Sequence, residues 1–350
     1  PKLTVKSKAL VNKLPELFEL LYQIIFTSKF SDKKRLKELI IQSKTNMELE
    51  MLNSAQQIVA SRLYSYFTPS GAYNEQGGLA FYGFIQNLSD HFDEKYEEIC
   101  ADFTEILKRV FTRSNLLVSV TMRDTQYNIF ESKFTEFVSN LDTAEYPAET
   151  FPFKINKRNE GFQSSSLVQY VGCGANFVRK GYAYNGSLLV LSTILRCTYF
   201  WNRIRVLGGA YGAFVKFGSD GDLYFGSYRD PNLTETLQVY KDMVKFLKEF
   251  NVSKREMTKY IIGTISTLDT PLTPAGKARA ADVAYIRNIC DADIQNVRNE
   301  VLGIKQADIQ NLAELINDCL TDSAICVVGN EAKLAKHKDI FKSLSNIFEA

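Results

Sequence analysis

Two residues whose side chains could act on a polar substrate flank a pair of glycines in the second half of the chain. In the stretch "NRIRVLGGAYGAF", Arg205 precedes Gly208 and Gly209, and Tyr211 follows them. A guanidinium and a phenol both donate hydrogen bonds and neither is a base at neutral pH, which suits them to stabilise an oxyanion formed from a carbonyl. The two glycines would also admit close approach of a substrate to the backbone.

The chain between these two residues decides whether they can act together. Six residues of a straight strand would separate Arg205 from Tyr211 by about 20 Å. A helix ending near Arg205, a turn at the glycines and a reversing strand could instead bring both side chains to one site. A simpler interpretation is that Arg205 offsets the negative end of its helix dipole and that Tyr211 is a half-buried strand aromatic. Residue types and spacing leave both interpretations open.

Other kinds of catalytic site have little support in this sequence. The segment "LSDHFDEKYEE" around His91 lacks the HxxEH or HExxH pattern of zinc peptidases, and His337 lies in the basic segment "KLAKHKD". Both histidines are therefore predicted to be solvated, and no Ser-His-Asp or Cys-His set can be assembled. Gly208, Gly209 and Gly212 are not followed by the Lys-Ser/Thr of a phosphate-binding loop, so nucleotide binding is not expected.

Composition sets broad limits. The 350 residues are 45% hydrophobic with a net charge of +2, which is enough chain for about two domains and shows no bias toward nucleic acid or acidic membranes. The most apolar stretch, "SLLVLSTILRCTYFW", is interrupted by Arg196 and is shorter than the ~20 residues of a membrane span. Six cysteines without a CxxC pair are predicted to be reduced and mostly buried. No signal peptide is visible, and the start at Pro1 suggests a processed or truncated polypeptide.

Hydrophobic periodicity gives the elements of the first half. A long helical pattern starts at Ser31 or Asp32 and continues to a turn-rich break at 68–78. The elements expected after it are helices near 78–89 and 94–112, a buried strand at 115–122 and a helix at 127–141. The polar segment 142–152, with two prolines, is the predicted linker.

The second half is expected to contain more strands. Asp220-Gly221 predicts a hairpin turn between antiparallel strands, Pro231 the first position of a helix, and Ser253 with Glu256 a capping box. The predicted strands are 151–158, 167–173, 211–218, 222–228 and 323–329, and the predicted helices include 185–205, one starting at Thr273-Pro274, 291–302 and 305–319.

The order of elements repeats, which indicates a fold class. Two helices, a buried strand and a closing helix are expected at 78–141 and again at 275–348. We therefore predict an α+β protein of two tandem units, each a mostly antiparallel sheet packed on one side by helices. The predicted domains are residues 1–141 and 153–350, joined by the linker.

The stretch around the glycines resembles the carboxyl half of the insulinase (pitrilysin) family of zinc metallopeptidases, in the presequence-peptidase and falcilysin branch. The motifs that carry the resemblance are "W..IR..GGAYG" from Trp201 to Gly212 and "SYRDPNL..TL..Y" from Ser227 to Tyr240. In the first half, "RLYSYFTPSGAYNEQGGLAFYGF" at 62–84 is similar to the third domain of that branch. The resemblance implies insulinase-type α/β rolls, with a third domain that lacks its first strands and a fourth domain that carries Arg205 and Tyr211.

The resemblance also implies a mechanism. Members of this branch are four-domain clamshells whose amino half carries the zinc motif and its glutamate base. Their carboxyl half closes over an unfolded peptide and supplies an arginine and a tyrosine to the active site, at positions that match Arg205 and Tyr211. Tyr211 would then stabilise the oxyanion, Arg205 would hold a substrate carbonyl, and Gly208 and Gly209 would line the substrate's path. Unfolded peptides, rather than nucleic acid or membrane, are the implied substrates.

This sequence departs from the family pattern because it contains neither HxxEH nor a visible distal zinc ligand. We therefore expect that the chain alone binds no catalytic zinc and cleaves nothing, and that zinc is bound by the missing amino-terminal half. Two alternatives are a stand-alone, non-catalytic peptide-binding subunit that pairs with a separate zinc-bearing subunit, and a helical scaffold without peptide chemistry. The expected location is the bacterial cytoplasm or an organelle matrix, without secretion.

Overall fold

The structure, a computed structural model, describes residues 2–147 and 149–349, so that Ala148 in the predicted linker lies outside the described residues. By internal contacts the chain forms two compact units. The first comprises residues 1–43, 86–152 and 272–288, and the second comprises 44–85, 153–271 and 289–350. The domain division at 142–152 stays a prediction. No described helix is both long enough and apolar enough to cross a membrane.

The first unit is built mainly of helices. Phe18 of its first helix packs against three phenylalanines of α7, with ring centroids 5.5 to 6.1 Å apart. Asp32 caps the helix that follows, because its carboxylate accepts the Arg35 amide at 2.9 Å, as the sequence predicted. The helices with residues in this unit are α1 (Leu14–Phe26), α2 (Lys33–Asn53), α5 (Leu79–Asp90), α6 (Phe92–Val110), α7 (Tyr127–Val138) and α11 (Pro274–Arg287), with α2 and α5 also entering the second unit.

The strand expected at 115–122 is not formed. Leu116, Leu117 and Val118 are exposed, and among the described residues before β1 the only bridge pairs Thr112 with Asp142. The apolar run favours a strand, but a strand is stable only when neighbouring strands complete its hydrogen bonds and cover one face. The prediction of a sheet in the first half was therefore wrong for the described structure.

The second unit contains a six-stranded mixed sheet, which confirms the α+β class. The strand order is β3-β4-β2-β5-β1-β6, with antiparallel pairs β3·β4, β4·β2 and β2·β5 and parallel pairs β5·β1 and β1·β6. The strands are β1 (Glu160–Ser164), β2 (Tyr170–Asn176), β3 (Gly212–Phe217), β4 (Asp222–Tyr228), β5 (Ala324–Asn330) and β6 (Ser343–Asn346). The strand expected at 151–158 is wrong, since β1 begins at Glu160.

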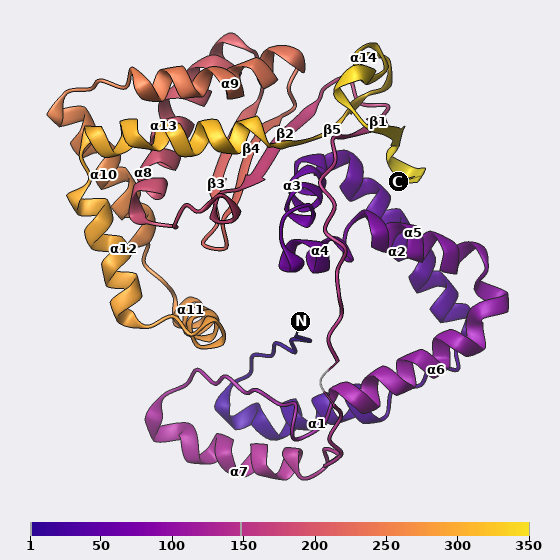
Figure 1. Cartoon of the computed structure of the whole chain (residues 1–350). Helices are drawn as coiled ribbons and strands as arrows, with labels where there is room; N and C mark the ends of the chain where they lie inside the picture. The colour runs from indigo at the N-terminus through magenta and orange to yellow at the C-terminus, as the bar shows by residue number, and fades with distance from the viewer. Residues whose placement is uncertain (1, 148, 350) are drawn as a thin grey trace. The chain divides into compact units, whose positions relative to one another are not determined.

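Helices cover both faces of this sheet, whereas the sequence predicted helices on one side only. Alternate residues of β2 enter different clusters: Val171 and Cys173 join the core under α9 (Thr234–Lys248) and α13 (Gln306–Thr321), and Tyr170 joins the core under α3 (Ala55–Ser65). Figure 1 shows α9 and α13 on one side of the strands and α3 on the other. A Cβ on Gly172 would lie 2.2 Å from a Val59 methyl, so glycine in β2 is what admits α3.

The remaining helices of this unit connect the strands. Ser253 forms the predicted capping box with Glu256. In the first unit, Thr273 caps α11, which starts at Pro274 as predicted. Pro231 is not the first helical position as predicted, because α9 begins three residues later at Thr234. The other helices are α4 (Pro69–Glu75), α8 (Gly186–Ile194), α10 (Lys254–Leu268), α12 (Asp291–Gly303), α14 (Glu331–Lys336) and two short π-helices, η4 (Leu195–Tyr199) and η5 (Trp201–Leu207).

A buried charge network ties α3 and α4 to β1. Glu160, 2% exposed, accepts Arg62 Nε at 2.7 Å and Nη2 at 3.3 Å, and it also accepts the Tyr66 hydroxyl. Arg62 also reaches Glu75 at 3.4 Å, and Ser61 donates to the same carboxylate at 2.7 Å. Burial acts to raise the pKa of Glu160, but the hydrogen bonds from Arg62 and Tyr66 outweigh it and the pKa lies below its ordinary value. Burial keeps the pKa of Glu75 above its ordinary value.

Candidate functional site

The two residues singled out by the sequence lie together at one end of β3. The Arg205 guanidinium carbon is 5.8 Å from the centre of the Tyr211 ring. The turn therefore produces the juxtaposition that a straight strand could not. Tyr211 is 68% exposed, so it is not the half-buried aromatic of the simpler interpretation.

The helix that carries Arg205 has an uncommon form. Residues 201–207 are in π-helical conformation, which usually occurs as single turns and frequently at functional sites. Within it, the Arg205 guanidinium lies 4.1 Å from the centre of the Trp201 ring, which is close enough for a cation–π interaction. Arg205 is thus held between two aromatic rings, those of Trp201 and Tyr211.

The glycines are required by the geometry of the turn. Gly209 has φ of +79°, a left-handed conformation that commonly ends helices, and its amide donates to the Arg205 carbonyl at 3.0 Å. A Cβ on Gly208 would lie 2.6 Å from the Ile204 carbonyl oxygen. Their predicted part in substrate binding stays a prediction, since chain geometry alone accounts for both glycines.

The second family-like motif holds this turn in place. The Asn232 side chain donates to the Gly208 carbonyl at 2.6 Å, and the Tyr211 amide donates to the Tyr228 carbonyl at 3.0 Å. Asn232 is itself fixed, because its backbone N–H donates to the carboxylate of the fully buried Asp230 at 2.8 Å. Sequence reasoning missed Asn232, although its place directly after Asp230-Pro231 marks it as a turn residue.

Replacing Gly209 with alanine should destabilise the second unit by about 1–2 kcal/mol, because alanine resists a left-handed backbone. The added methyl has room, since the nearest atom, Pro231 Cγ, would be 3.5 Å away. Gly212→Ala is the matched control: its Cβ would meet Tyr228 Cβ at 3.7 Å, and its backbone has no positive φ. Urea unfolding of both variants measures the difference. Equal stability would show that the conformation of Gly209 is not what shapes the turn.

The surface around the pair is aromatic and positively charged. The Tyr211 ring packs edge-on against Tyr228 at 5.8 Å, and Phe214 packs against the same ring at 6.4 Å. Among the described residues, neither Arg205 nor the Tyr211 hydroxyl has a hydrogen-bond or ion-pair partner, so their donors face solvent. The arrangement can present an N–H fork and an O–H to a carbonyl or carboxylate group.

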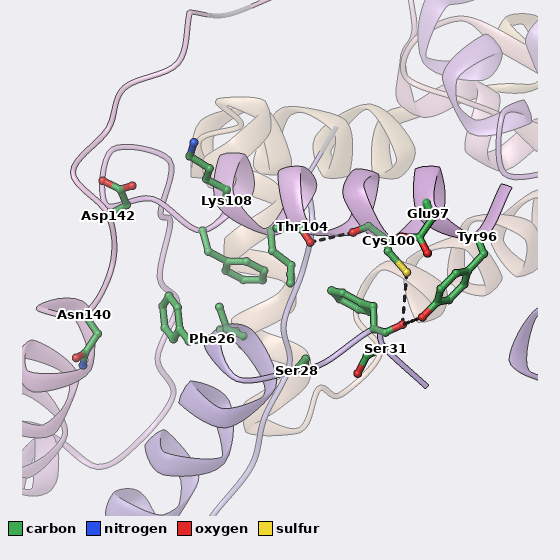
Figure 2. Close-up of a pocket in the computed structure, with 14 residues that line it drawn as sticks. Phe26, Ser28, Ser31, Tyr96, Glu97, Cys100, Thr104, Lys108, Asn140 and Asp142 are labelled. Carbon is green, nitrogen blue, oxygen red and sulfur yellow. Dashed lines mark hydrogen bonds between the residues drawn. The ribbon is translucent and has the colours of Figure 1, made fainter. Parts of the chain in front are cut away.

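One cavity of the described structure is lined by residues other than this pair. It measures about 830 Å³ and belongs to the first unit, between the end of α1, helix α6 and residues 140–142. Tyr96 and Cys100 both donate to the Phe30 carbonyl, at 3.2 and 3.4 Å. Figure 2 shows these two side chains among those that line the cavity. The residues that line it include no histidine to pair with the Cys100 thiol as in a Cys-His site.

The cysteines and histidines offer no other site in the described structure. Burial raises the pKa of Cys173 to about 11 and that of Cys319 to about 12, which disfavours the reactive thiolate. All six cysteines are free; only three are buried, fewer than predicted, since Cys197 and Cys290 are exposed. The described residues contain no group of three or more His, Cys, Asp or Glu placed to hold a metal ion.

Comparisons with known proteins agree with the motifs. Residues 159–331 match the family model described as PreP C-terminal domain, and residues 1–88 match the model of a domain associated with peptidase family M16, subfamily C. Protein HypA of Clostridium perfringens is 34% identical over all of this chain and 36% of its own length. Presequence protease 1 of Arabidopsis thaliana, chloroplastic/mitochondrial, is 31% identical over 93% of this chain and 30% of its own length. The chain thus spans about a third of the length of these curated relatives.

Solved structures share the fold. Pitrilysin superposes with a TM-score of 0.59 at 13% identity, over 96% of this chain and 36% of that protein. A protease from Helicobacter pylori superposes with a TM-score of 0.58 at 15% identity, over 91% of this chain and 77% of that protein. At these identities the likeness speaks for the architecture alone.

Proposed function

Because this chain belongs to the M16 (insulinase/pitrilysin) peptidase family and corresponds to the carboxyl-terminal part of presequence proteases, we propose that it is the closing, substrate-binding half of a zinc metalloendopeptidase. The full-length protein would degrade unfolded oligopeptides in an enclosed chamber. The observation that carries the proposal is the exposed pair of donors, Arg205 and Tyr211, on a rigid turn. Neither donor has a hydrogen-bond partner among the described residues, which leaves both available to a substrate.

Each residue of the pair would have a separate task. Tyr211 would donate its hydroxyl proton to the oxygen of the scissile carbonyl, where negative charge develops in the transition state. Arg205, held against Trp201, would donate to a backbone carbonyl of the peptide and fix its register. Gly208 and Gly209 leave the turn without side chains, so the peptide backbone could pass close to it.

The metal would lie outside this chain. The zinc would be bound by the amino-terminal part of the full-length protein, as the resemblance to the family implies. Partners of the chain are then that amino-terminal part and the unfolded peptide. The protein would act in the bacterial cytoplasm or an organelle matrix. The second location agrees with the names of the plant and animal presequence proteases, which are chloroplastic/mitochondrial and mitochondrial.

Peptide cleavage by the separate parts tests this proposal. We expect no cleavage of an unfolded peptide by the 350-residue chain, and cleavage by the full-length protein or by a mixture of this chain with the amino-terminal part. The reason is that the donors and the metal lie on different parts. Chelator-sensitive cleavage by the isolated chain would contradict the proposal. So would full activity of the amino-terminal part alone.

A further inference from the structure

Arg229 is a second guanidinium on the same surface, and the family motif around it gave it no role. It follows Tyr228 directly, and its guanidinium carbon lies 5.6 Å from the centre of the Tyr228 ring. That ring is 5.8 Å from the ring of Tyr211, which is itself 5.8 Å from Arg205. Each arginine therefore contacts one member of a pair of tyrosines that pack edge to face.

The backbone of Arg229 is in an unfavourable conformation. Its φ is +47°, and apart from Asn288 it is the only non-glycine residue with positive φ in the described structure. Glycine adopts such a conformation freely, whereas a residue with a Cβ is held there at a cost. Residues kept in sparsely populated conformations cluster at functional sites. An arginine where glycine would fit better indicates that the side chain itself is needed.

The side chain has no acidic partner among the described residues. Arg229 is exposed, and interaction with the Tyr170 hydroxyl raises its pKa, so it stays charged. No described carboxylate lies within ion-pair distance of either Arg229 or Arg205, so two positive charges on one small surface are left without neutralisation. A planar guanidinium is the side chain best suited to bind a carboxylate through two hydrogen bonds.

We propose that Arg229 binds a carboxylate of the peptide substrate. Arg205 would hold the peptide backbone while Arg229, across the Tyr211–Tyr228 pair, selects peptides that bring a negative charge to this position. The carboxylate is either an acidic side chain or the carboxyl terminus of the peptide. This inference rests on the proposed function of the Arg205–Tyr211 pair, and it adds a specificity that the pair alone does not have.

Fluorescence of the chain's single tryptophan tests the proposal, since Trp201 lies under Arg205 at the site. An unstructured peptide with one glutamate and a free carboxyl terminus is titrated into the 350-residue chain, followed by the Glu→Gln peptide and the carboxyl-terminal amide. We expect one of the two changes to weaken binding about tenfold, because a hydrogen-bonded charge is lost. Which change does so identifies the source of the carboxylate.

The variants separate this proposal from the proposed function. Arg229→Gln should bind all three peptides equally, with the lower affinity that the wild-type chain shows for the peptide without the recognised carboxylate. Arg205→Gln should lower the affinity for all three peptides by a similar factor, so that the difference between them is kept. If Arg229→Gln still discriminates, or if the wild-type chain binds the peptides equally or not at all, the proposal for Arg229 is overturned. If Arg205→Gln weakens peptide binding but Arg229→Gln does not change the discrimination, the proposal for Arg229 fails while the proposed function of the Arg205–Tyr211 pair stands.

A glycine variant excludes a folding defect. Arg229→Gly should raise the melting temperature, because glycine accepts the positive φ, while it removes the discrimination between peptides. A lower melting temperature than that of the wild type would show that Arg229 is retained for stability. That result would also overturn the proposal.

Discussion

Replacing Tyr211 with phenylalanine should lower the kcat of the full-length peptidase by about 100- to 1,000-fold, while KM changes little, because loss of one oxyanion-stabilising donor costs roughly this factor. The hydrogen bond from the hydroxyl to the substrate oxygen would strengthen as that oxygen acquires charge, so the loss falls mainly on the transition state and little on ground-state binding. The ring itself stays, so its packing at 5.8 Å on Tyr228 and its contact with Arg205 are kept. Steady-state cleavage of an unfolded peptide gives both constants.

A control variant shows whether the effect belongs to the site. Tyr285 in α11 is 75% exposed and has no place in the proposed site, so Tyr285→Phe should leave kcat unchanged. If Tyr211→Phe raised KM and left kcat unchanged, Tyr211 would contribute only ground-state binding. Unchanged values of both constants would remove Tyr211 from the mechanism.

Replacing Glu160 with glutamine should cost about 3–5 kcal/mol of stability, the range expected when one partner of a buried ion pair is removed. Glutamine has the same shape but one oxygen fewer, and it leaves Arg62 and Tyr66 without the charge that satisfies them. The network joins α3 to the first strand of the sheet, so its loss affects how α3 packs on that face. Urea unfolding at neutral pH measures the change.

Glu75→Gln is the matched comparison in the same network. It should cost less than Glu160→Gln, because burial already disfavours the charge on Glu75. The two carboxylates also differ in pH dependence. The lowered pKa of Glu160 adds stability that is lost as the pH falls through that pKa. The raised pKa of Glu75 makes stability decline as the pH rises from the ordinary glutamate pKa of about 4.3.

Unfolding of both variants between pH 3 and 8, roughly the range that spans these titrations, separates the contributions. In Glu75→Gln, the stability should no longer decline as the pH rises. In Glu160→Gln, the stability should no longer increase as the pH rises from the acidic range. Equal losses at neutral pH with parallel pH profiles would contradict the assignment of opposite shifts.

Features coded by neighbouring residues could be predicted from the sequence. The hairpin at Asp220-Gly221 is formed as expected, with Gly221 at φ +92°. The capping box at Ser253 and the helix start at Pro274 also follow from local hydrogen bonds within one turn. The turn that joins Arg205 to Tyr211 belongs to this class, because Gly208 and Gly209 impose its geometry.

Features that depend on distant parts of the chain could not be predicted. The segment 115–122 has the residues of a strand, but pairing depends on strands that no local signal supplies. The packing of α3 on the sheet depends on contacts between Leu63 and β2, which lie far apart in the chain; the alternating glycines of "YVGCGAN" were the available signal. The bond from Asn232 to Gly208 likewise joins two motifs that the sequence shows separately.

The most direct test of the account is a structure of the full-length protein with a bound, uncleaved peptide. We expect the Tyr211 hydroxyl at about 3 Å from the oxygen of the scissile carbonyl, the distance of an oxyanion-stabilising donor. Arg205 should donate to a neighbouring backbone carbonyl of the peptide. A peptide bound with both side chains still facing solvent, away from its backbone, would contradict the central claim.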